Sequence, residues 1–145
     1  MSNLPLPDGL ELTETNQLAN SLHSFAIGLL RDARKADIAT GLTPERLSIL
    51  SILLYVGSKT VNQLAEMEQV SAPAITRIVK SLEKDGYVIK AKSKTDQRVV
   101  FVSVTRKAKS LMEAARAKRI SSIASKLDKL DSASMSQLSD VLSKF

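Results

Sequence analysis

Apolar residues return along the first part of the chain at every third or fourth position, which is the period of an α-helix. This repeat begins after Thr13, continues to Ala36 and is ended by Gly41. Thr43 and Pro44 then supply an N-cap and a first helical residue for a segment that is apolar almost all round. The pattern therefore predicts a long amphipathic helix followed by a buried helix.

Two further helices are predicted after this pair, with only a few residues between them. Thr60 and Gln63 have the spacing of a capping box, Ser71 can cap the next helix, and Gly86 ends it. The inward stripe of that helix consists of Ile75, Ile78, Val79 and Leu82, and most of its cations lie away from the stripe. A short helix, a tight turn and a helix with a cationic outer face describe a helix-turn-helix.

The helical spacing gives way to alternation between Tyr87 and Thr105, in YVIKAKSKTDQRVVFVSVT. This pattern predicts a β-hairpin of two strands around a polar tip, and a hairpin directly after a helix-turn-helix makes a winged helix. Thr105 can cap a long helix that follows, and Asp131 or Ser132 breaks that helix and caps a final one. The predicted fold class is mainly α: a central winged helix with a two-stranded wing, flanked by N- and C-terminal helices.

The flanking helices carry more apolar surface than a small winged helix can cover. One interpretation is packing within the chain, and the other is a two-fold dimer interface. A length of 145 residues fits one domain, so both interpretations place residues 1–145 in a single folding unit.

The net charge of +6 is concentrated in one quarter of the sequence. Between Ser71 and Lys107 there are nine cations and three acids, whereas the remaining twelve cations and twelve acids cancel. Such segregation favours a localised anionic partner. The alternative is an ordinary solvated face.

Double-stranded DNA is the anionic partner that this arrangement fits. The candidate contacts on the recognition helix are Ser71, Pro73, Thr76, Arg77 and Lys80, and those on the wing are Lys92, Lys94, Asp96 and Arg98. Arg77 can bond a guanine edge, and free N–H groups in the first turn can bind phosphate. Lysines gain counterion release on any duplex, and an arginine at a narrow tip can enter a minor groove. Asp96 can fix the tip by accepting hydrogen bonds from an arginine or a backbone N–H, or it can be a simple turn residue.

Other kinds of function find little support in the sequence. There is no cysteine and only one histidine, His23, which is more typical of a packing or surface residue than of a catalytic base. We therefore expect no enzyme activity, no metal site and no cofactor. The first residues lack the features of a signal peptide, and no apolar run reaches the roughly 18 residues of a membrane span. We expect a cytoplasmic protein without a membrane partner.

Residues 42–105 resemble the MarR family of winged helix-turn-helix transcription regulators. The resemblance rests on LTPERLSIL, on TVNQLAEMEQVSAPAITRIVKSLEKDG, and on Asp96-x-Arg98 ahead of a strand that ends at Val104-Thr105. It implies a DNA-binding lobe at about 42–105 and dimerisation helices at about 13–40 and 106–145. It also implies a homodimer, a minor-groove role for Arg98, and a small-molecule effector held beside the dimerisation helices. Gln69 and Ala108 stand where relatives often have glycine, and the absence of cysteine removes the family's peroxide-sensing branch.

Two functions of different classes are consistent with these features. The favoured one is a homodimeric transcription regulator, a repressor, that binds a pseudo-palindromic operator in double-stranded DNA and is released by an effector. The alternative is a winged-helix interaction module whose basic face binds an acidic protein.

Overall fold

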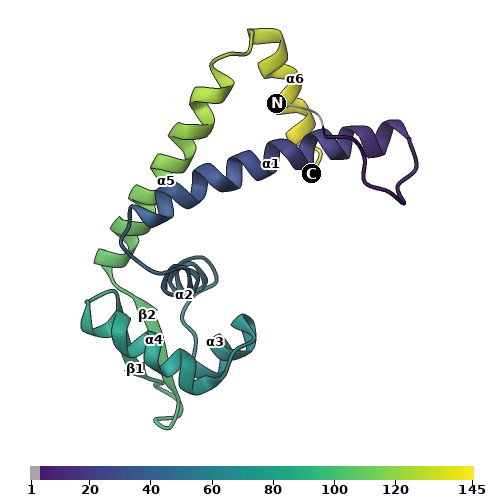
Figure 1. Cartoon of the computed structure of the whole chain (residues 1–145). Helices are drawn as coiled ribbons and strands as arrows, with labels where there is room; N and C mark the ends of the chain where they lie inside the picture. The colour runs from purple at the N-terminus through teal and green to yellow at the C-terminus, as the bar shows by residue number, and fades with distance from the viewer. Residues whose placement is uncertain (1–3) are drawn as a thin grey trace. The chain divides into compact units, whose positions relative to one another are not determined.

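The structure is a computed structural model that describes residues 4–145, and within them six helices and one two-stranded antiparallel sheet are present. The elements are α1 (Glu14–Ile38), α2 (Pro44–Tyr55), α3 (Val61–Glu68), α4 (Ala72–Lys84), β1 (Val88–Lys92), β2 (Val100–Val104), α5 (Arg106–Leu127) and α6 (Ser132–Leu142) (Figure 1). This order confirms the predicted fold class, a winged helix with a two-stranded hairpin and flanking helices.

The chain forms two compact units. Residues 37–117 form the winged-helix unit, and residues 4–36 together with 118–145 form the terminal-helix unit. The winged-helix unit therefore extends beyond residue 105 into the first half of α5. That first half contributes buried side chains, so it belongs physically with the winged helix.

The winged-helix unit has one apolar core, to which each of its complete helices and both strands contribute. The core residues are Ile49, Leu50 and Leu53 of α2, Leu64 and Ala65 of α3, Ile75, Val79 and Leu82 of α4, Val88 of β1, Val102 of β2, and Ala108 and Met112 of α5. Burying each large aliphatic side chain stabilises the fold by about 1.5–3 kcal/mol. The prediction that α2 is buried holds for its body but not for its C-terminal end, because Tyr55 and Val56 are mostly exposed.

The helix starts follow the predicted capping pattern. At the beginning of α2, α3, α4, α5 and α6 a side-chain oxygen accepts the backbone N–H three residues later; these caps are Thr43, Thr60, Ser71, Thr105 and Asp131. Gln63 returns a hydrogen bond to the backbone N–H of Thr60, which completes the capping box. The bonds from Ser134 lower the pKa of the Asp131 carboxyl below its ordinary value of 3.8.

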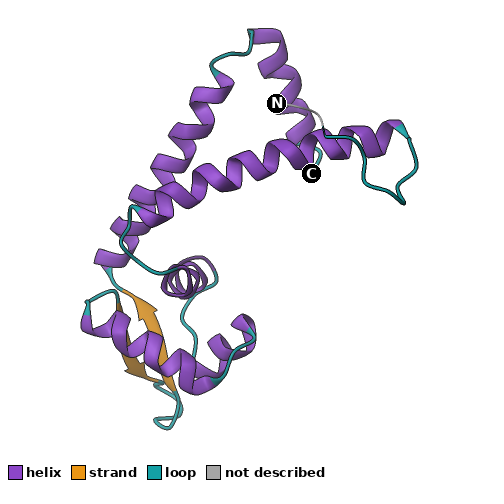
Figure 2. Cartoon of the chain, viewed as in Figure 1, coloured by secondary structure: helices purple, strands orange, loops and turns teal. Residues whose placement is uncertain are grey.

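The hairpin is joined to the segment before α3 by backbone hydrogen bonds. β1 and β2 pair antiparallel with Val88 opposite Val104 and Lys92 opposite Val100 (Figure 2). Lys59, in the segment before α3, forms an isolated antiparallel bridge with Val102 through two backbone hydrogen bonds of 3.2 and 2.8 Å. The hairpin therefore has a third backbone partner on the outer side of β2, which fixes its base to the rest of the unit.

The terminal-helix unit exposes much of its apolar surface. α1 and α6 contain no buried residue, and Leu18, Leu22 and Leu30 of α1 are each more than half exposed. An ion pair joins Asp32 of α1 to Lys126 of α5, with 2.9 Å between Asp32 Oδ2 and Lys126 Nζ. The hydrogen bond and the charge of Lys126 lower the pKa of the Asp32 carboxyl below 3.8.

The turn between α3 and α4 contains a non-glycine residue in the left-handed region. Gln69, the C-cap of α3, has φ of 56° and ψ of 40°, and its backbone N–H donates to Ala65 and Glu66. The turn therefore forms with a Cβ in the left-handed region, which has a steric cost of about 1–2 kcal/mol.

We predict that Gln69→Gly raises the free energy of unfolding by up to about 1 kcal/mol, because glycine removes the steric cost but gains entropy in the unfolded chain. Gln69→Ala is the matched control, since alanine keeps the Cβ and should leave stability nearly unchanged. Chemical denaturation measures both values. A loss of stability in the glycine variant would contradict the assigned strain.

Candidate nucleic-acid interface

The apolar stripe of α4 determines which of its side chains face outward. Ile75, Val79 and Leu82 are almost completely buried, and Ile78 packs against the same core. Because α4 turns through about 100° per residue, the opposite side carries Pro73, Arg77, Lys80 and Lys84, all of which are exposed. Thr76 is also exposed, next to this row. The predicted contacts of the recognition helix are thus brought together on one solvent-facing side.

Ser71 has a structural task at the start of α4. Its Oγ accepts the backbone N–H of Ala74 at 3.3 Å, and this bond uses one of the free N–H groups of the first turn. The serine hydroxyl retains its own hydrogen for donation to an external acceptor. Pro73 lies in the first turn, where its missing N–H has no cost to the helix.

The wing tip is closed by hydrogen bonds in which Asp96 is central. Asp96 Oδ1 accepts the backbone N–H of Arg98 at 3.0 Å and the Nε–H of the same arginine at 3.2 Å. The Asp96 carbonyl accepts from Val99 N, and Ser93 N donates to the Val99 carbonyl at 2.8 Å. Both kinds of donor expected for Asp96 are therefore present, and the carboxylate orients a guanidinium whose side chain remains 91% exposed.

Apart from Arg98, the cations of the basic segment fall into two groups. Lys90 Nζ lies 3.0 Å from Glu83 Oε2 and ties β1 to α4, and Lys107 packs against Tyr87. No ion pair within residues 4–145 involves the second group, which comprises Arg77, Lys80, Lys84, Lys92, Lys94 and Arg106. The cations of the second group are available to an external anion, and so is Arg98, whose side chain stays 91% exposed although it pairs with Asp96. The charge pattern of the sequence did not separate these groups, because Glu83 pairs with a residue seven positions away on another element.

A polar cluster at the end of α4 has no counterpart among the predicted site residues. The Arg46 guanidinium contacts the Asp85 carboxylate, and Lys107 Nζ donates to the Asp85 carbonyl at 2.7 Å. The two cations come from the starts of α2 and α5, 39 and 22 residues from Asp85. Separations of this size leave no periodic signal, so only the folded structure reveals the cluster.

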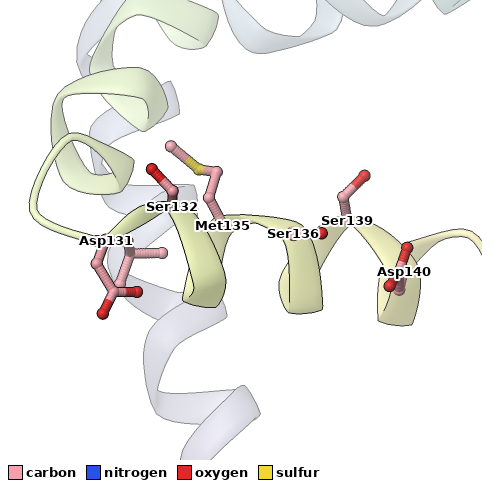
Figure 3. Close-up of a pocket in the computed structure, with 7 residues that line it drawn as sticks. Asp131, Ser132, Met135, Ser136, Ser139 and Asp140 are labelled. Atoms are coloured by element: carbon pink, nitrogen blue, oxygen red, sulfur yellow. The ribbon is translucent and has the colours of Figure 1, made fainter.

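Two hollows on the described surface differ in chemistry. One of about 340 Å³ lies between α2 and α4 and includes Arg46, Arg77 and Ser81 in its lining. The other, of about 390 Å³, is formed by α6 and the turn before it, with serine hydroxyls, Met135, Asp131 and Asp140 (Figure 3). The second hollow has no cation in its lining, so its chemistry does not suit phosphate.

Neither a metal centre nor a membrane span is found in the described part of the chain. Among residues 4–145 no group of three or more histidine, cysteine, aspartate or glutamate side chains is arranged to hold a metal ion. No helix in the same range is both long and apolar enough to cross a bilayer.

Similar proteins were found by sequence and by structure. The model of the MarR family matches residues 42–100. An uncharacterized helix-turn-helix transcriptional regulator of Mycobacterium bovis is 33% identical over 115 residues, which are 79% of this chain and 80% of that protein. The transcriptional regulator Tm0710 of Thermotoga maritima superposes with a TM-score of 0.80 at 26% identity, covering 88% of this chain and 89% of that one. A MepR mutant of S. aureus bound to an oligodeoxyribonucleotide has a TM-score of 0.72 at 18% identity, with 92% and 96% coverage.

Proposed function

This chain belongs to the MarR family of winged helix-turn-helix transcription regulators, and we propose that it is a cytoplasmic repressor that binds a pseudo-palindromic DNA operator as a homodimer. The observation that carries the proposal is the row of exposed, unpaired cations on α4 together with the arginine that Asp96 orients on the wing. A MepR mutant of the same fold is bound to an oligodeoxyribonucleotide, which supports DNA as the partner.

In the proposed complex, α4 lies in the major groove. Arg77, exposed at the centre of the outward row, bonds a guanine through its O6 and N7, and Lys80 contacts a phosphate. Ser71, Thr76 and the N–H groups of the first turn contact the backbone or a base edge beside it. The buried stripe holds these side chains on one side of α4 without any contribution from DNA.

The wing has a different task in the same complex. Arg98 enters the minor groove, where a narrow A·T tract concentrates negative potential, and Asp96 holds the guanidinium for entry. Lys92 and Lys94 neutralise phosphates whatever the sequence. The helix thus reads base identity and the wing reads groove width.

The exposed apolar side chains of the terminal-helix unit support the homodimer. Neither α1 nor α6 buries a residue within the chain, although both carry apolar side chains at helical spacing. A second copy can cover these side chains through a two-fold interface. Two copies then present two recognition helices to half-sites about 34 Å apart or a multiple of this distance.

Release by a small-molecule effector is part of the proposal, on the strength of family membership. An effector shifts DNA affinity only by the difference between its affinities for the DNA-binding and non-binding arrangements. Small aromatic acids are a suitable first set for a screen of operator release. If no compound in the set changes the affinity for the operator, the screen supports a constitutive repressor instead.

The alternative, a module that binds an acidic protein, is distinguished by binding to random duplex at rising salt. Neutralised phosphates make log K fall linearly with log salt, with a slope of about −0.9 for each phosphate. A chain that binds no duplex even at low salt would exclude the proposed function.

We predict that Arg77→Ala weakens operator binding by about 1–3 kcal/mol and relaxes the base preference at one position. Lys92→Ala is the matched charge loss, and it should weaken all duplexes equally and reduce the salt slope by roughly 1. Binding titrations against operators with single-base changes, at two salt concentrations, measure both effects. Uniform losses in both variants would show an undifferentiated basic patch.

For the wing, we predict that Arg98→Ala loses most of its affinity at operators with A·T flanks and little at operators with G·C flanks. Asp96→Ala should behave in the same way, because the guanidinium loses its acceptor. Asp96→Asn keeps an oxygen that can accept from Arg98, and it should keep most of the preference for A·T flanks. Tighter binding by both Asp96 variants would instead mean that the carboxylate only repels phosphate.

We predict that the chain is a dimer at micromolar concentration and that Leu18→Lys weakens the dimer at least about tenfold. Each copy would lose a leucine that the proposed interface buries, which contributes about 1.5–3 kcal/mol. Gln17→Lys adds the same charge one position away on an exposed polar residue, and it should leave the dimer intact. Removal of the residues after Asp131 should also weaken association. Sedimentation equilibrium measures these constants, and a monomeric wild-type chain would overturn the homodimer.

A further inference from the structure

Three elements meet at the C-terminal end of α4 through one residue, Asp85. Its carboxylate contacts the guanidinium of Arg46 at the start of α2, and its carbonyl accepts from Lys107 Nζ at the start of α5. Both cations also lie over the ring of Tyr87, with distances to the ring centroid of 5.9 Å for Arg46 Cζ and 4.7 Å for Lys107 Nζ. We call Arg46, Asp85, Tyr87 and Lys107 the Asp85 clamp.

The clamp constrains a motion that the apolar core leaves open. Apolar contacts are not directional, so the stripe of α4 sets which side faces the core but opposes a small shift along the helix axis weakly. Charge-assisted hydrogen bonds have preferred distances and directions. The Asp85 clamp applies two such bonds to the C-cap residue of α4, and it anchors them on two helices that are themselves fixed by buried residues.

The partial burial of Arg46 strengthens this constraint. The Arg46 side chain is only 17% exposed, and its Nε is buried without a hydrogen-bond partner among the described residues. A cation in this environment depends on Asp85, because removal of the carboxylate leaves a poorly solvated charge. By comparison, Lys90, the cation that pairs with Glu83 of α4, has a side chain that is 34% exposed, against 17% for Arg46.

We propose that Asp85 is a positioning residue for DNA recognition: held by Arg46 and Lys107, it fixes the axial position of α4 and therefore the alignment of Arg77 with its base. The inference rests on the proposed DNA-binding function. Asp85 contacts no base and acts through the helix that it ends. Its expected effect is on the ratio of operator affinity to random-duplex affinity, since phosphate contacts tolerate a small shift and bidentate base contacts do not.

The decisive experiment compares Arg46→Gln with Asp85→Asn. The first lowers the net charge of the chain by one and the second raises it by one. If the clamp positions α4, both variants lower the ratio of operator affinity to random-duplex affinity at least about fivefold, as expected for one misaligned bidentate contact. If these residues act only through their charge, random-duplex binding weakens in Arg46→Gln and tightens in Asp85→Asn, and the ratio stays constant. The second result would overturn the proposal.

Two further variants separate positioning from general destabilisation. Arg46→Lys retains a cation for Asp85, and it should recover part of the ratio that Arg46→Gln loses. Lys107→Met removes the second bond to Asp85, whereas Lys109→Met removes an equal charge from an exposed position two residues further along α5. We expect the ratio to fall in Lys107→Met and to stay at the wild-type value in Lys109→Met. Equal ratios in these two variants would also overturn the proposal.

Thermal unfolding shows which variants are folded at the temperature of the titrations. If Arg46→Gln does not fold, Asp85→Asn and Lys107→Met still test the proposal. Asp85 and Lys107 are more exposed than Arg46, and Lys109→Met is the control for Lys107→Met. The proposed function has a separate failure. A wild-type chain that shows no preference for any operator over random duplex contradicts sequence-specific binding, whereas a wild-type preference that survives in every clamp variant contradicts only the role of Asp85.

Discussion

The apolar stripe of α4 is the constraint on which the rest of the winged-helix unit depends. Ile75, Val79 and Leu82 can leave water only by packing against α2, α3 and the hairpin, and this packing fixes the rotation of the helix. Once that rotation is fixed, the cations on the other side must face solvent. The same residues that stabilise the fold therefore also create its basic surface, so one helix provides both a large part of the core and the basic surface.

Features set by local sequence could be predicted from the sequence. Helix starts depend on a side chain and a backbone N–H three residues apart, as at Thr60 and Gln63, so spacing alone reveals them. The hairpin and the inward stripe follow from periods of two and of three to four residues. Asp96 and Arg98 are two residues apart, and for this reason their hydrogen bonds were also within reach of sequence reasoning.

Contacts between distant segments could not be predicted in this way. The N-cap and the proline account for the start of α2, where Arg46 lies, without any role for Asp85. No pattern in the residues between Arg46 and Asp85 indicates that the two side chains are in contact. The net charge of the basic segment was correct as a sum, but it did not reveal that Lys90 and Lys107 have partners within the protein. Such pairs form only when the helices and strands have packed around the core. The spacing of residues in a single sequence does not reveal them.

The closed wing tip has a consequence for the thermodynamics of association. Ser93, Asp96 and Val99 are already joined by hydrogen bonds in the free chain, so the backbone of the tip is ordered before a partner arrives. Ordering one residue costs roughly 1–2 kcal/mol in conformational entropy, and here that cost belongs to folding. If a loop becomes ordered only when it binds DNA, the heat-capacity change on binding has two contributions. One comes from the folding of the loop and the other from the surface buried in the interface. For this wing, the heat-capacity change on binding should report buried surface alone.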